Sequence, residues 1–241
     1  KVDFLYSPDL DMWHHTHLMD ATVGTHLIAP SFALPPQGAV VEYAPEVRGW
    51  LAEYESKYGK RGFSSRTADK VPLDRTCGDA RVVDVRSLVG TIPKSQWPAS
   101  PEITVDLLQA DEKANGEYRA GQIIIFHTGH IDRHFKPAPD DKGVWHDPLT
   151  GKAEGWPAPG PDAINYLHSK GIRCLATDAP DLGGVDPRRA LMAYWALGSN
   201  DMVGVEFLNN VGTIPASAYF LFAATRIRDS HASPGRAIVL W

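Results

Sequence analysis

Residues 121–134 read Gly-Gln-Ile-Ile-Ile-Phe-His-Thr-Gly-His-Ile-Asp-Arg-His, and this stretch decides the fold class. The apolar run over 121–126 is rich in β-branched residues, which predicts a strand buried on both faces. The polar stretch that follows, 127–160, is rich in Pro, Asp, Gly and Trp and is too long for a plain connection. We therefore expect a buried central strand that leads directly into a lid or active-site loop.

A helix, a glycine and a strand follow this loop in close succession. Residue 161 begins a predicted helix, Gly171 ends it, and residues 172–177 form a strand, an order typical of α/β architecture. The other predicted elements are helices at 44–58 and 187–197, strands at 1–5, 79–89, 202–207, 219–226 and 237–240, and a short element at 103–108. The pattern thus predicts a single mixed α/β domain over residues 1–241 with a sheet or barrel-like core.

The composition agrees with one domain and argues against several classes of function. The 241 residues are 43% hydrophobic and 22% charged, with a net charge of −5, which is unlike a nucleic-acid-binding protein. No segment approaches the roughly 18 uninterrupted apolar residues of a membrane span. Cys77 and Cys174 cannot build a disulfide framework, in agreement with a reducing compartment. We expect a cytoplasmic protein with a small-molecule partner, although the first residue, Lys1, is compatible with a removed leader.

Ten histidines are present, and several of them cluster. His127, His130 and His134 surround Asp132 directly after the predicted buried strand, where α/β proteins usually place catalytic groups. A functional role for at least one of these three histidines and a purely structural role in a polar loop fit the spacing equally well. For the other cluster, His14, His15 and His17, a structural role is favoured, because near-adjacent side chains cannot all point into one site.

Two carboxylates stand at the ends of predicted buried strands. Asp178 follows the strand at 172–177, and Glu206 lies near the end of the strand at 202–207. Burying a carboxylate is costly unless it is paired, hydrogen-bonded or bound to a metal. The two residues are therefore either functional groups or hydrogen-bonded structural ones.

The order of these elements resembles the cyclase family of metal-dependent hydrolases, of the kynurenine formamidase and isatin hydrolase kind. The matching stretches are Gly24-Thr25-His26 with Pro30, residues 71–84, residues 121–129, residues 161–180, Glu206-Phe207-Leu208-Asn209 and residues 233–237. The resemblance implies a swivelling β/β/α fold, a homodimer or homotetramer, and hydrolysis of a small amide or lactone by an activated water.

The metal-binding signature of that family is incomplete in this sequence. His26 and Glu206 match its ligand positions, but Thr22, Ile28 and Phe32 stand where the family has a histidine, an aspartate and a second histidine. A catalytic zinc usually has three protein ligands. Either a divalent metal, zinc or manganese, is held by His26 and Glu206 with recruited ligands, or the site is metal-free. The best substitutes as ligands are His130 and Asp132, and His17 is a weaker one.

The sequence thus favours an enzyme that hydrolyses or ring-opens a small amide or lactone. The open alternatives are a metal-independent lyase, dehydratase or cyclase, in which His130, His26 and Glu206 act as general acid and base, and a non-catalytic binding protein. The residues expected to bind substrate are Asp178, Arg188, Phe32 and Thr22. Trp145 and Trp156 in the 127–160 loop either shape the substrate site or belong to the core.

Overall fold

The computed structural model describes the backbone of residues 2–7, 9, 12–137 and 139–241, and the side chains of residues 9, 18–137 and 139–241. The strands are β1 (Val2–Ser7), β2 (Met12–His17), β3 (His26–Ile28), β4 (Cys77–Asp84), β5 (Glu102–Ile103), β6 (Ile123–His127), β7 (Ala158–Pro159), β8 (Cys174–Thr177), β9 (Val203–Glu206), β10 (Ser217–Ala224) and β11 (Ala232–Leu240). The α-helices are α1 (Pro45–Tyr58), α2 (Val105–Asn115), α3 (His130–His134), α4 (His146–Leu149), α5 (Pro161–Ser169) and α6 (Pro187–Ser199).

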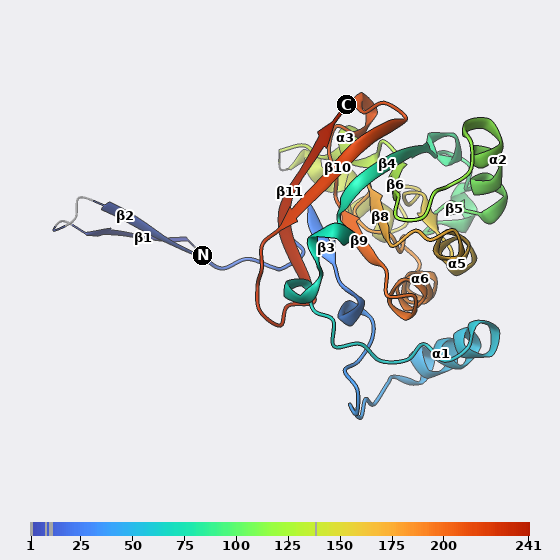
Figure 1. The fold of residues 1–241 in the computed structure, drawn as a ribbon, viewed down its shortest axis with the longest axis horizontal. Coiled ribbons are helices and arrows are strands. Elements are labelled where there is room, and N and C mark those ends of the chain that lie inside the picture. Colours follow the sequence, from blue (N-terminus) through green and yellow to red (C-terminus); the bar gives the residue numbers. More distant parts are fainter. Residues whose placement is uncertain (1, 8, 10–11, 138) are drawn as a thin grey trace.

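A closed barrel forms the centre of the structure, with strand order β10–β11–β3–β9–β8–β6–β4 (Figure 1). The strands β4, β6, β8 and β9 are parallel to one another, whereas β3, β10 and β11 pair antiparallel with each other or with the two outer parallel strands, β4 and β9. β1 and β2 form a separate antiparallel hairpin that projects away from the barrel. The predicted mixed α/β fold with a barrel-like core is therefore confirmed.

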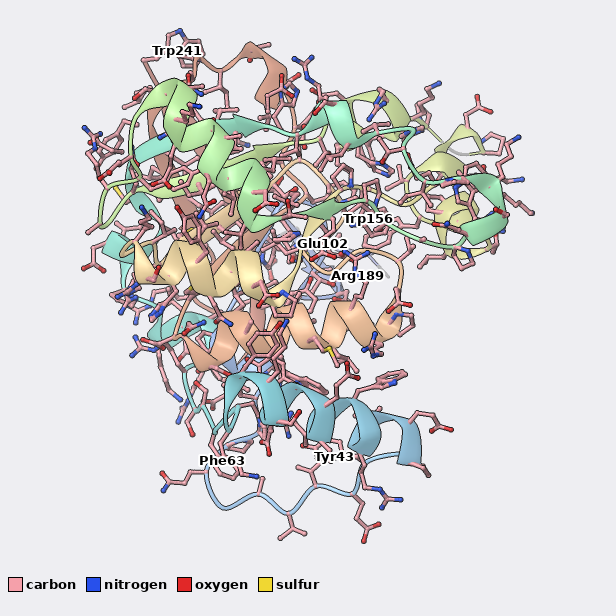
Figure 2. All side chains as sticks on the ribbon, turned by 90° about the vertical axis from the view of Figure 1, so that its right-hand side faces the viewer. Tyr43, Phe63, Glu102, Trp156, Arg189 and Trp241 are labelled. Atoms are coloured by element: carbon pink, nitrogen blue, oxygen red, sulfur yellow. The ribbon has the colours of Figure 1, made fainter. Side chains whose placement is uncertain are left out.

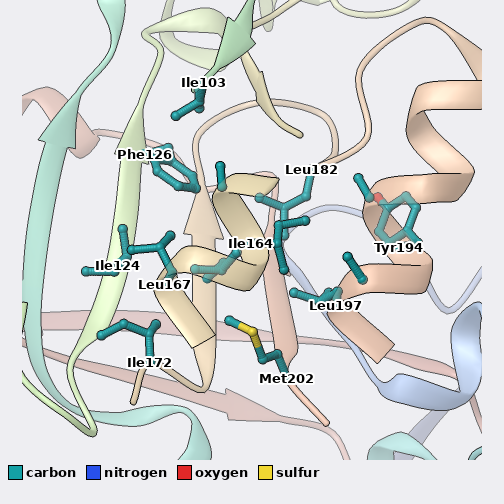
Figure 3. Packing of buried hydrophobic residues seen from close by; sticks show 14 of the residues in the cluster. Ile103, Ile124, Phe126, Ile164, Leu167, Ile172, Leu182, Tyr194, Leu197 and Met202 are labelled. Atoms are coloured by element: carbon teal, nitrogen blue, oxygen red, sulfur yellow. The ribbon is translucent and has the colours of Figure 1, made fainter. Parts of the chain in front are cut away.

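Four helices cover one side of the barrel. Figure 2 shows α1, α6, α5 and α2 stacked one above the other in that order. α5 faces the sheet with Ile164 and Leu167, which belong to the same buried cluster as Ile124 and Phe126 of β6 (Figure 3). This burial follows from the apolar spacing within α5 and from the unbroken apolar run of β6. Among the described helices, none is long and apolar enough to cross a membrane.

The predicted elements are present, with shifted ends that have local causes. β6 begins at Ile123 rather than at residue 121, because Gly121 has a φ of 82° and the Gln122 N–H donates to the Arg119 carbonyl in a turn. The short element at 103–108 is instead β5 followed by the longer helix α2, which Thr104 caps by accepting from the Leu107 N–H. The last strand, β11, extends through Pro234 and is longer than predicted.

Gly171 is required by the turn between α5 and β8. Its φ is 86°, and a Cβ atom at this position would lie 2.5 Å from the Ala120 Cβ. We expect Gly171→Ala to lower the free energy of unfolding by about 1–3 kcal/mol, because both the backbone strain and the clash oppose it. Urea unfolding measures the loss. Gly49→Ala is the matched control: Gly49 lies within α1 with open space at its Cβ, so this change should stabilise by about 0.5–1 kcal/mol.

Candidate functional site

His26 and Glu206 meet because two barrel strands pair in register. β3 and β9 run antiparallel, with His26 directly opposite Glu206, so their side chains lie on the same face of the sheet. The His26 Nε2 atom is 3.1 Å from the Glu206 Oε2 atom, and both side chains are almost fully buried. Of the residues predicted for the site, these two are the pair that the structure brings into direct contact.

The hydrogen-bond partners indicate that His26 carries a positive charge. Its Nδ1 atom lies 2.8 Å from the Gly24 carbonyl oxygen, which can only accept, so Nδ1 donates there. Glu206 accepts at Oε1 from the Leu182 N–H and the Tyr194 hydroxyl, and at Oε2 from His26 Nε2. Burial alone would lower the pKa of His26, but the hydrogen bond and charge of Glu206 raise it. Below this raised pKa, His26 is an imidazolium that donates to Glu206.

Asp181 adds a second carboxylate, in the loop after β8. Its Oδ1 atom accepts from the Trp156 indole N–H at 3.1 Å and from the Gly183 and Gly184 N–H groups at 2.8 and 2.7 Å. Burial, followed by the nearby charge of Glu206, raises the pKa of Asp181 to about 7. Asp181 can therefore exist as both acid and base near neutral pH.

These groups line a cavity of about 180 Å³. Its polar lining residues are Thr22, His26, Asp181, Tyr194 and Glu206, and its apolar lining residues are Ile28, Phe32, Trp145 and Pro180. Burial raises the pKa of Tyr194, which keeps its hydroxyl protonated as the donor to Glu206. Larger hollows lie elsewhere, one of them of about 500 Å³ beside Val71 and Phe222, but no described histidine lines these hollows. The cavity at His26 is therefore the candidate active site.

Two tryptophans of the 127–160 segment have different positions. Trp145 lines the cavity, is 40% exposed, and stacks on Phe207 with ring centroids 6.4 Å apart. Trp156 is fully buried, and its indole edge holds Asp181. Trp145 can therefore contact a bound ligand, whereas Trp156 does not line the cavity and binds the Asp181 carboxylate through its indole N–H.

His130 and Asp132 do not line the cavity. His130 donates from Nε2 to the Val144 carbonyl and packs edge-on against Trp156, with ring centroids 5.3 Å apart. Burial lowers the pKa of His130 to about 4, so it is neutral at pH 7. Asp132 accepts from the Asn210 N–H through Oδ1. The side chain of His17, the weaker candidate ligand, lies outside the described residues.

The remaining predicted substrate-binding residues divide between the cavity and other places. Phe32 lines the cavity and packs edge-on against Tyr194, and Thr22 lines it while donating to Asp20. Asp178 is fully buried and accepts from the Thr128 N–H and hydroxyl and from the Gly129 N–H. Burial raises the pKa of Asp178 against the effect of these donors. Arg188 forms an exposed ion pair with Glu53 on the outer side of α6.

The residues present do not fit a divalent metal. Ile28 and Phe32, at the positions that the family resemblance assigns to ligands, have no lone pair to donate. His26 and Glu206 use the atoms that would face a metal to bind each other. Among the side chains that the structure describes, no three of His, Cys, Asp and Glu come together as a metal site. The expected set of His26, Glu206, His130 and Asp132 is therefore divided between two locations.

Asp181 and Tyr194 line the cavity but were not predicted as site residues from the sequence. Asp181 follows Asp178 by three residues and precedes two glycines, whose N–H groups it binds. A carboxylate followed by a glycine pair at the end of a buried strand was the available signal. Tyr194 gave no such signal, because it lies within the apolar face of α6.

Comparisons with known proteins agree with this architecture. Residues 4–183 match the family model described as "Putative cyclase". The chain is 31% identical over 188 residues to an isatin hydrolase of Roseibium aggregatum, and the match covers 75% of this chain and 65% of that protein. Among solved structures, an isatin hydrolase bound to the product analogue thioisatinate superposes with a TM-score of 0.68 at 24% identity. An isatin hydrolase A from Ralstonia solanacearum superposes with a TM-score of 0.70 at 19% identity. Both superpositions cover 100% of this chain, and 82% and 81% of those chains respectively.

Proposed function

Because the chain belongs to the cyclase family, we propose that it is a hydrolase that adds water to the carbonyl group of a small cyclic amide or lactone and so opens the ring. One observation carries this proposal: the cavity at His26 combines an imidazole whose pKa is raised with a carboxylate that is poised near neutral pH. The isatin hydrolase relative supports the substrate class, since isatin is a cyclic amide.

His26 contributes through its charge. Both of its ring N–H groups are already donated, to Gly24 and to Glu206, so it has no free proton to transfer. A positive charge in an enclosed site stabilises the negative charge that develops on a carbonyl oxygen when water attacks. The apolar side chains of Ile28, Phe32 and Trp145 limit the access of bulk water, which strengthens this interaction.

The segment 127–160 is the proposed lid over this cavity. It supplies Trp145, the aromatic side chain that lies at the cavity while remaining partly exposed. A homodimer or homotetramer stays a prediction from the family resemblance, and sedimentation analysis of the purified chain measures it.

Hydrolysis is tested with isatin as the cyclic amide and dihydrocoumarin as the lactone. We expect mass spectrometry to show products heavier than the substrate by one water. A product that has lost one water would instead support the lyase or dehydratase alternative. Binding of either compound without any product would support a non-catalytic binding protein.

Removal of metal ions is expected to leave the rate unchanged. His26, Asp181 and Glu206 line the cavity but are not arranged to hold a metal ion: His26 and Glu206 bind each other, and Asp181 Oδ1 accepts three N–H groups. A chelator therefore has nothing essential to remove. The check is elemental analysis of the purified protein, with rates before and after treatment with EDTA and with 1,10-phenanthroline. Zinc or manganese at one equivalent per chain, lost together with activity, would contradict the expectation.

A further inference from the structure

We infer that Asp181 is the proton-accepting group of this cavity and that it activates the attacking water. The inference rests on the proposed hydrolytic function and names a residue for its central step. The two oxygens of the Asp181 carboxylate have different surroundings.

The Oδ1 atom of Asp181 is fixed in place. Three N–H groups donate to it, from Trp156, Gly183 and Gly184, at distances of 2.7 to 3.1 Å. This arrangement orients the carboxylate rigidly without using its second oxygen. A catalytic base needs such fixed orientation, because a small displacement of the acceptor lowers the rate strongly.

The Oδ2 atom of Asp181 is open to the cavity. Among the described residues no donor binds it, yet none of their buried side-chain oxygens or nitrogens lacks a hydrogen-bond partner. The Asp181 side chain is only partly buried and lines the cavity beside His26 and Glu206, which leaves Oδ2 as the oxygen available to a ligand. Glu206 cannot take this role, because both of its oxygens already accept hydrogen bonds.

Hydrolysis of the ring needs only water and the substrate, with Asp181 as the proton carrier. Asp181 Oδ2 accepts a proton from water as the water oxygen bonds to the carbonyl carbon, and the electrons of the C=O double bond move to the oxygen. When the tetrahedral intermediate collapses, the ring C–N or C–O bond breaks. The proton on Asp181 passes to the departing nitrogen or oxygen, so that the carboxylate is regenerated. The product carboxylic acid then loses its proton to solvent.

The groups around Asp181 set the direction of the pH dependence. Glu206 on β9 raises its pKa, and burial acts in the same direction. The other ionisable neighbours among the described side chains are His26 on β3, Tyr194 on α6 and, on the far side of Trp156, His130 on α3. Since the active form has Asp181 as the carboxylate and His26 as the imidazolium, kcat/KM should rise with pH through about 7 and fall again once the pH exceeds the raised pKa of His26.

The test compares Asp181→Asn with the wild type. Asparagine keeps an oxygen for the three donors but replaces the free oxygen with an amide, so the fold should be retained and the base lost. We expect kcat/KM for isatin or dihydrocoumarin to fall by about a hundredfold or more, without the inflection near pH 7. Asp186→Asn is the matched control, because it preserves the N-cap of α6 outside the cavity and should leave the rate unchanged.

A second readout needs no substrate. The Trp156 indole N–H is bonded to Asp181, so its ¹⁵N–¹H resonance, assigned with Trp156→Phe, should titrate near pH 7 in the wild type and not in Asp181→Asn. The histidine His130 is present in both proteins, so it does not produce this difference.

The outcomes separate the inference from the proposed function. Hydrolysis by Asp181→Asn within about threefold of the wild type, or a Trp156 resonance that does not titrate, overturns the role of Asp181 and leaves the hydrolase standing. A titrating resonance in a protein that hydrolyses neither probe counts against the proposed function, and leaves Asp181 only as a group that binds and releases a proton near pH 7. The absence of both overturns both.

Discussion

Asp178→Ala is expected to lower the free energy of unfolding by about 3–5 kcal/mol, a large share of the roughly 5–15 kcal/mol typical of a domain. The reason is that the buried Asp178 carboxylate accepts three hydrogen bonds, from the Thr128 N–H and hydroxyl and from the Gly129 N–H. Alanine leaves the Thr128 and Gly129 N–H groups buried without a partner, and leaves the Thr128 hydroxyl only the distant carbonyl oxygen of residue 178, at 3.5 Å. Those donors join the end of β6 to the end of β8, so the loss should also loosen the start of α3.

Chemical denaturation of a short series measures this effect. Asp178→Asn should lose less, about 1–3 kcal/mol, because its oxygen still serves Thr128 while its amide opposes the Gly129 N–H. Asp162→Ala is the control: Asp162 forms an exposed ion pair with Lys57, and its loss should cost under about 1 kcal/mol. If Asp178→Ala were as mild as this control, the carboxylate would not hold the two strand ends together.

Glu206→Gln is expected to remove the positive charge of His26 and to cost about 3 kcal/mol of stability. Glutamine can still accept from Leu182 and Tyr194, but its amide would then meet the His26 Nε2–H, donor against donor. His26 relieves this conflict by losing that proton. Without Glu206, burial dominates, so the pKa of His26 should move from above its ordinary value to below it.

The sign of the pH dependence follows from the raised pKa of His26. A histidine whose pKa is higher in the folded than in the unfolded protein stabilises the fold fully below the unfolded value of about 6.5. That stabilisation is lost as the pH rises through the folded value. The difference between wild type and Glu206→Gln should therefore be largest in acid and shrink in alkali.

Two measurements follow both parts of this prediction. Unfolding curves at several pH values give the stability difference, and ¹⁵N–¹H correlation of the histidine ring gives the protonation of His26. Glu53→Gln, which breaks the exposed pair with Arg188, is the matched control and should cost under about 1 kcal/mol at every pH. A His26 ring that stays doubly protonated in Glu206→Gln at neutral pH would contradict the ion-pair assignment.

Much of the fold could be predicted from the sequence because its central elements have strong local patterns. The apolar run of β6 and the helix–glycine–strand unit around Gly171 are set by residues close in the chain. Closure of the barrel could not be predicted in the same way, because β3 has three residues and its pairing with β9 and β11 joins segments about 180 and 200 residues away.

The candidate site was predictable in part for the same reason. His26 and Glu206 followed from the family resemblance, and the register of β3 and β9 places them together. Asp181 was missed because its properties come from Trp156 and from burial, neither of which a local sequence pattern reveals. Arg188 carries a charge suited to a substrate carboxylate, but Glu53 of α1 neutralises it on the surface.

The short strand β3 connects the chemistry of the cavity to the integrity of the barrel. In the barrel, β3 lies between β11 and β9 and pairs with both. Its first residue is His26, the charged residue of the cavity. The ion pair with Glu206 therefore adds a side-chain contact to the backbone pairing of β3 with β9. Any ligand or substitution that removes the positive charge of His26 also weakens this contact, so the protonation state of the cavity is linked to the stability of the β3–β9 edge.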